Sequence, residues 1–123
     1  MSSWLLVFCG GGFGAVARYG ISVWLGPSRL LEGEFPWATF VANTLACFVL
    51  AVGVALGARG WLERPGQLFL LTGFCGGFST FSTYVLEAQT QVRGGFSGAA
   101  AVYVLASLVV GVGVLWLTSY LFR

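Results

Sequence analysis

The stretch from Gly76 to Tyr84 holds the residue types in this sequence that are best suited to bind an ion. It reads Gly-Gly-Phe-Ser-Thr-Phe-Ser-Thr-Tyr and lies inside a long uncharged run. Each of the paired glycines weakens a helix by about 1 kcal/mol relative to alanine. Hydroxyl side chains follow the glycines at Ser79, Thr80, Ser82 and Thr83. The pattern predicts a helix break near 76–80, which would release backbone carbonyls and amides.

A break of this kind offers ligands for ions of either sign. Freed carbonyls suit a hard cation, whereas the N-terminus of a half-helix suits an anion. If the helix resumes after the break, Phe81 and Tyr84 lie three residues apart, beside the hydroxyl stripes. A ring edge carries partial positive charge and can face an anion. The alternatives are an intact helix whose hydroxyls bond to the preceding turn, and an aromatic stripe that only fills the core.

More uncharged donors recur at helical spacing elsewhere in the chain. Thr39 and Asn43 are four residues apart, as are Tyr103 and Ser107. Each pair taken alone is typical of a hydrogen bond between neighbouring helices. Beside a broken helix, the two pairs together favour a polar pathway.

The composition indicates whether water or a lipid bilayer surrounds these residues. Charged residues make up 8% of the 123, against about 25% in an ordinary globular protein. Hydrophobic residues make up 58%, and six basic and four acidic residues cannot cover a water-soluble surface. A soluble monomer is therefore excluded, and the chain is predicted to be an integral membrane protein.

The same composition excludes several classes of function. The sequence has no His, Asp or Lys, which leaves most metal-hydrolase and histidine-base chemistry without its residues, so we expect no enzyme. A net charge of +2 is too small to indicate nucleic-acid binding. Cys9, Cys47 and Cys75 have neither zinc-site nor disulfide spacing and are typical of packing residues.

The apolar runs predict an all-α fold. A helix needs about 20 apolar residues to cross the hydrocarbon. Four such spans are expected at about 3–25, 36–57, 66–92 and 96–122. They form a single four-helix transmembrane domain over residues 1–123, with the third helix broken in mid-membrane. Only short connections remain between the spans.

Two charged residues fall inside or near the ends of these spans. Arg18 could extend to the membrane interface or take part in a functional pair. Glu87 follows Thr80 by about 10 Å of helix rise. It could pair with Arg18, line a vestibule, or reach the far interface.

The loops carry a nearly balanced number of arginines. Four spans place Arg59, Arg64 and Arg123 on one side and Arg29 and Arg93 on the other. Such a balance is what insertion in both orientations would produce, and chance among so few arginines would also produce it.

Small residues recur four apart, which favours self-association through close helix contacts, with packing inside one chain as the alternative. The pairs are Gly10/Gly14, Gly53/Gly57, Gly73/Gly77 and Gly94/Gly98.

Three motifs together resemble the CrcB/Fluc fluoride-channel family. They read Gly-Gly-Phe-Gly-Ala-Val-Ala-Arg-Tyr at 11–19, Pro-Trp-Ala-Thr-Phe-Val-Ala-Asn at 36–43, and the stretch at 76–84. The resemblance implies a passive fluoride exporter in the cell membrane of a microbe. It also implies an antiparallel, dual-topology homodimer with two pores and a structural sodium ion at its centre.

The resemblance assigns roles to individual residues. Backbone carbonyls of Gly76 and Ser79 from both copies would hold the sodium. Asn43 would donate its side-chain amide to fluoride, Phe81 would be the first pore aromatic, and Tyr84 would take the second aromatic position, which is commonly Phe. The remaining polar lining would comprise Ser82, Thr83, Tyr103 and Ser107, with Thr39 in the second motif.

Other classes of function stay open on the sequence alone. A dual-topology small multidrug exporter also has four spans, but it needs a membrane carboxylate for proton exchange, and Glu87 is the candidate. A non-transporting assembly subunit would explain the small-residue packing without explaining a hydroxyl-rich broken helix.

Overall fold

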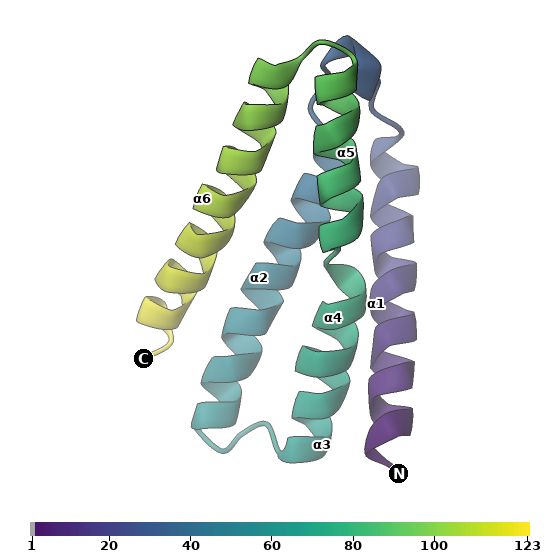
Figure 1. Ribbon diagram of the computed structural model, residues 1–123. Coiled ribbons are helices and arrows are strands. Elements are labelled where there is room, and N and C mark those ends of the chain that lie inside the picture. The colour runs from purple at the N-terminus through teal and green to yellow at the C-terminus, as the bar shows by residue number, and fades with distance from the viewer. Residues whose placement is uncertain (1) are drawn as a thin grey trace.

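The computed structural model describes residues 2–123, so that Met1 of the expected domain lies outside it. Figure 1 shows long helical segments that run side by side, with both ends of the chain at the same end of the bundle. The spans number four. All four are long and apolar enough to cross a membrane, which confirms the predicted all-α membrane fold. The described residues contain no strand.

The bounds of the spans lie within two residues of the expected ones. The first, second and fourth spans are α1 (Ser3–Leu25), α2 (Trp37–Ala58) and α6 (Ser97–Leu121). The third span extends over Arg64–Arg93 in several pieces. These are α3 (Arg64–Gln67), the π-helical η2 (Leu68–Cys75), α4 (Gly76–Phe78) and α5 (Phe81–Arg93).

Local sequence explains where the first two spans begin. The hydroxyl of Ser2 caps α1 by accepting a hydrogen bond from the Leu5 amide at 3.3 Å. Pro36 is buried and directly precedes α2. A proline is tolerated there because the amides of a first helical turn have no partner within the helix.

The glycines pack α1 closely against the third span. A Cβ on Gly10 or Gly14 would overlap the carbonyl oxygen of Phe69 or Phe74, respectively. A Cβ on Gly73 would lie 2.9 Å from the Gly10 Cα. For Gly10, Gly14 and Gly73 the structure therefore supports the alternative of packing inside one chain, because these glycines bring two backbones of the same chain together.

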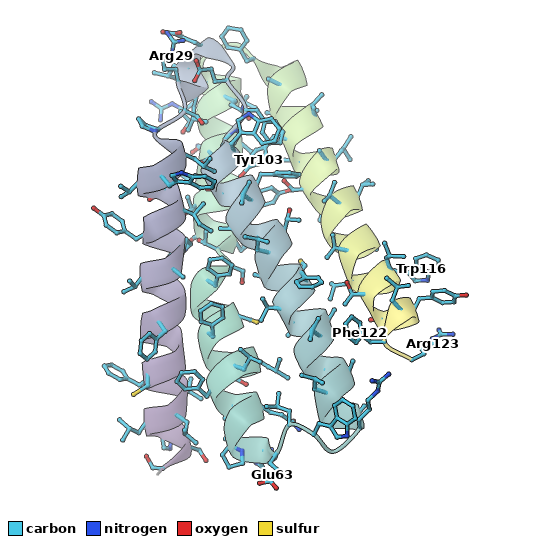
Figure 2. All side chains as sticks on the ribbon, turned by 180° about the vertical axis from the view of Figure 1, so that it is seen from behind. Arg29, Glu63, Tyr103, Trp116, Phe122 and Arg123 are labelled. Atoms are coloured by element: carbon cyan, nitrogen blue, oxygen red, sulfur yellow. The ribbon has the colours of Figure 1, made fainter. Side chains whose placement is uncertain are left out.

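The connection between α1 and α2 closes one end of the bundle, where Figure 2 shows Arg29. It contains the short 3₁₀ helix η1 (Leu30–Glu32). Arg29 forms ion pairs with Glu32 at 3.0 Å and with Glu34 at 2.7 Å. Glu63, Phe122 and Arg123 lie at the opposite end, as four crossings require.

Arg29 should make Glu34 titrate at unusually low pH. Its backbone amide and guanidinium donate to the Glu34 carboxylate at 2.9 and 2.8 Å, which lowers the pKa of Glu34 below its ordinary 4.5. Because the pKa is lowered in the folded state, the contribution to stability exists above pH 4.5 and disappears as the pH falls through the folded pKa. We expect the carboxyl ¹³C resonance of Glu34 to titrate at higher pH in Arg29→Gln, and an unchanged midpoint would contradict this contact.

Candidate functional site

The third span changes backbone conformation at Ser79 and Thr80. Helix α4 ends at Phe78 and α5 begins at Phe81, and Figure 1 shows a short non-helical stretch between them. Ser79 has φ −81° and ψ 154°, and Thr80 has φ −147° and ψ 117°. Both residues are therefore extended, so that the end of one helix faces the beginning of the next.

Hydroxyl groups stabilise both sides of this interruption. The Ser79 hydroxyl donates to the Cys75 carbonyl at 2.8 Å, which is the bond to the preceding turn that the alternative interpretation anticipated. The Thr80 hydroxyl caps α5 by accepting a hydrogen bond from the Thr83 amide at 3.3 Å. An N-cap of this kind satisfies one of the amides that a helix start leaves without a partner.

Asn43 reaches the interruption from α2. Its side-chain oxygen accepts a hydrogen bond from the Thr80 amide at 2.8 Å, and its side-chain nitrogen donates to the Thr80 carbonyl at 3.3 Å. Both halves of the Asn43 amide are thus bound to the backbone of one residue. The nitrogen carries two hydrogens, so one remains for another acceptor.

Arg18 reaches the interruption from α1. Its Nε donates to the Gly77 carbonyl at 3.2 Å, close to the end of α4. Glu87 instead accepts a hydrogen bond from the Tyr103 hydroxyl at 3.1 Å. Within residues 2–123 no salt bridge joins Arg18 to Glu87, so the structure does not bring together the pair that the sequence left open.

A cavity of about 240 Å³ opens beside the extended residues, and α2, α5 and α6 contribute to it. Phe81 lies at this cavity with 77% of its surface exposed in the single chain. The lining is Asn43, Cys47, Ser79, Thr80, Phe81, Tyr84, Ser107 and Leu108. Five of the residues expected to act on ions therefore share one cavity: Asn43, Ser79, Phe81, Tyr84 and Ser107.

Aromatic hydroxyls and Ser107 form the wall toward α6. Tyr84 is buried against Tyr103, with ring centroids 5.1 Å apart in an edge-to-face arrangement, and its hydroxyl donates to the Val104 carbonyl at 2.8 Å. The Ser107 hydroxyl is buried and has no hydrogen-bond partner among the described residues. A buried hydroxyl without a partner is available to a ligand in the cavity.

Tyr103 links this wall to the closed end of the bundle. It is fully buried, and Figure 2 shows it just below the end that Arg29 marks. Its ring packs edge-to-face against Phe35 at 5.3 Å. Thr39 is buried, with its hydroxyl beside the Glu87 carboxyl. Thr39, Glu87 and Tyr103 therefore form one polar group between α2, α5 and α6.

A second cavity, of about 370 Å³, lies on the α1 side of Thr80. Its polar lining contains Arg18, Thr39 and Thr83. Thr80 lines both cavities. Ser82 is exposed and lines neither of them.

The backbone at Gly76 and Ser79 is accessible, which a cation bound by carbonyl oxygens would need. Both residues are exposed in the single chain, and a Cβ on Gly76 would meet nothing within 4 Å. The part of the chain that the structure describes has no cluster of three or more His, Cys, Asp or Glu residues. A hard cation at this place would therefore depend on backbone oxygens, which sodium accepts.

Gln91 is a structural residue that the sequence pattern did not single out. This side chain is fully buried on α5, and its nitrogen donates to the Glu34 carbonyl at 2.9 Å, which fastens the α1–α2 connection to α5. The i, i+4 spacing from Glu87 was a signal that could have placed Gln91 on the inner face of the helix.

Comparisons with known proteins agree with the resemblance. A family model described as CrcB-like protein, Camphor Resistance (CrcB), matches residues 5–119. A protein of Rhodospirillum centenum named fluoride-specific ion channel FluC is 42% identical over 97% of this chain and 94% of its own length. A protein of the same name from Chlorobium chlorochromatii is 40% identical over 92% and 86%, respectively. One from Thermus thermophilus is 38% identical over 88% and 84%.

These matches confirm the family that the three motifs indicated. They also confirm that the family consists of channels rather than enzymes, and they do not favour the drug-exporter alternative. With its four membrane-spanning helices, the chain is a multi-pass protein of the cell membrane and belongs to the CrcB family.

Proposed function

We propose that the protein is a fluoride-selective channel through which fluoride leaves the cell passively, and that it thereby protects the cell from fluoride. The observation that carries this proposal is the cavity at Ser79–Thr80, where uncharged donors meet the start of a helix. The names of the relatives, fluoride-specific ion channels, support the choice of fluoride.

The donors around the cavity suit a small, strongly hydrated anion. Asn43 has a second amide hydrogen, Ser107 has a buried free hydroxyl, and the first turn of α5 presents its backbone amides. Phe81 adds a ring edge. These groups replace water around the ion without a fixed positive charge, and a site in a conducting pore must release the ion as well as bind it.

Thr39, Tyr103 and Glu87 are proposed to continue this route toward the end of the bundle that Arg29 marks. Tyr103 and Thr39 supply hydroxyls within a buried polar group. Ser82 and Thr83 would extend the hydroxyl lining on α5. On the α1 side, Arg18 gives the second cavity a positive charge that attracts anions toward Thr80.

The proposed channel is an antiparallel homodimer in which each chain inserts in the opposite orientation. The exposed Phe81 and the open backbone at Gly76 and Ser79 would be covered by the second copy, in mid-membrane. The carbonyls of Gly76 and Ser79 from both copies would hold a structural sodium ion. Bound there, the ion would supply positive potential where the bilayer is most hostile to an anion.

Cells provide a direct test of the protective role. Expression of this chain in bacteria that lack their own fluoride export should restore growth in fluoride-containing acidic medium, because weakly acid medium drives fluoride into the cell. Growth should be restored in fluoride but should not change in medium with equal chloride. Equal fluoride sensitivity with and without the membrane-inserted protein would contradict the proposal.

A further inference from the structure

Asn43 binds the backbone of Thr80 through both ends of its side-chain amide, at 2.8 and 3.3 Å. This paired exchange resembles the one between two residues of adjacent antiparallel strands. We propose that Asn43 is the positioning residue that keeps the third span open. By holding the Thr80 amide, it prevents that amide from bonding to the Gly76 carbonyl, which therefore stays available to a cation.

The register of the helix supports this assignment. In an α-helix each amide donates to the carbonyl four residues earlier. The Ser79 amide still does so, since it bonds to the Cys75 carbonyl at 3.0 Å. The next bond in register would join the Thr80 amide to the Gly76 carbonyl, but that amide donates to Asn43 instead. The helical pattern thus stops at the residue that Asn43 binds.

Other groups at the interruption have other partners. The Gly77 carbonyl accepts from Arg18, and the Thr83 amide donates to the Thr80 hydroxyl. Among the backbone groups at the interruption, the amide and the carbonyl of Thr80 are therefore the ones that Asn43 binds. This matters in a membrane, where backbone groups without partners are costly and a free amide would bond to the nearest carbonyl.

The position of Asn43 is fixed by the packing next to it. Ala42 and Ala46 on α2 are buried against Phe78, the last residue of α4. This contact sets α2 against the third span directly beside the interruption. Asn43 is thus presented to Thr80 by a packed helix rather than by a mobile loop.

Asn43 also lines the cavity that we propose for fluoride. Its positioning of Thr80 and its binding of fluoride use different atoms of the side-chain amide. Its oxygen holds the Thr80 amide, whereas its nitrogen has a hydrogen for an anion. An Asn43→Asp variant keeps an oxygen for Thr80 and loses the nitrogen donor. An Asn43→Ala variant loses both, and Asn43→Leu also loses both while keeping the number and branching of the side-chain heavy atoms.

Selective labelling makes the backbone of Thr80 visible. With ¹³C-carbonyl serine and ¹³Cα,¹⁵N-threonine, a carbonyl–nitrogen correlation spectrum contains the pairs Ser79–Thr80 and Ser82–Thr83, because the sequence has no other Ser-Thr step. Thr83 serves as a helical reference. We expect the Thr80 Cα shift to be extended in the wild type and in Asn43→Asp, and to move to the helical range in Asn43→Ala and Asn43→Leu.

Sodium binding supplies the second readout, measured as thermal stabilisation by sodium chloride relative to choline chloride. Sodium affinity should fall by about tenfold or more in Asn43→Ala, equivalent to about 1.4 kcal/mol, and should be retained in Asn43→Asp. The control is Thr44→Ala, since Thr44 neighbours Asn43 but lines neither cavity, and it should behave as wild type.

The two readouts separate this inference from the proposed function on which its cation part rests. An extended Thr80 in both Asn43→Ala and Asn43→Leu would overturn the positioning role. A helical Thr80 in those variants with undiminished sodium affinity would overturn the link to the cation. Failure of the wild type to bind sodium would instead contradict the proposed sodium site, and the Thr80 shift alone would then decide the positioning role.

Discussion

Fluoride flux should fall by about 100-fold or more in Phe81→Ile, which corresponds to a rise of about 2.7 kcal/mol in the barrier to permeation. Phe81 lies at the cavity of Asn43 and Ser107, and isoleucine keeps much of the volume but has no ring edge to face an anion. Flux should be measured from liposomes that contain equal amounts of folded protein. Assembly should be unaffected, as judged by the elution volume of the purified protein.

Phe8→Ile is the matched control for Phe81→Ile. Phe8 is also 77% exposed in the single chain, but it lies on α1 near the start of the chain, away from the cavity at Thr80. The Phe8→Ile variant should therefore conduct fluoride like the wild type. Equal flux through Phe81→Ile and Phe8→Ile would remove Phe81 from the permeation path.

Replacing Gly14 by alanine should destabilise the fold by about 3 kcal/mol. The added Cβ would overlap the Phe74 carbonyl oxygen and would lie 2.8 Å from the Phe78 amide nitrogen. Both neighbours are backbone, so no flexible side chain can move aside. Because Phe78 directly precedes the extended residues, separating α1 from α4 would also disturb the site.

Gly12→Ala tests whether this effect comes from the contact. Gly12 lies on the same helix, and a Cβ there would meet nothing within 4 Å. Since alanine favours helix by about 1 kcal/mol over glycine, Gly12→Ala should melt at or slightly above the wild-type temperature. If Gly14→Ala has the same melting temperature as Gly12→Ala, the close approach of α1 to α4 does not contribute to stability.

The spans were predictable because hydropathy and length alone decide whether a helix can cross a bilayer. The ends of α1 and α6 therefore lie close to the expected residues. The interior of the third span was harder to predict. Its paired glycines Gly76 and Gly77 are themselves helical, and the extended residues are Ser79 and Thr80.

Gly73 and Gly77 of the third span serve packing against α1, which a single sequence does not reveal. A Cβ on Gly77 would overlap the Gly11 carbonyl oxygen, so glycine is required there by the approach of α1. Small residues spaced four apart predict a close helix contact, but the partner helix is set by the tertiary fold. For this reason the sequence left open whether these glycines pack within one chain or between copies, and the structure shows their contacts within one chain.

The sequence showed which polar residues the site contains, but it did not show which of them contact one another. Asn43 and Thr80 are 37 positions apart in the chain, and their two hydrogen bonds depend on how α2 is rotated against α4. Arg18 bonds to a carbonyl, a partner that leaves no mark in the sequence. Hydropathy and spacing thus identified the polar residues, and the packing of the helices determined which of them meet.

The proposed fluoride channel is tested most directly by anion efflux from liposomes that contain the purified protein, with fluoride and chloride followed by ion-selective electrodes. We expect rapid loss of fluoride and retention of chloride, since the cavity at Thr80 offers close uncharged donors to a small anion. Retention of fluoride by liposomes that contain folded, dimeric protein would contradict it, as would loss of chloride at the same rate as fluoride.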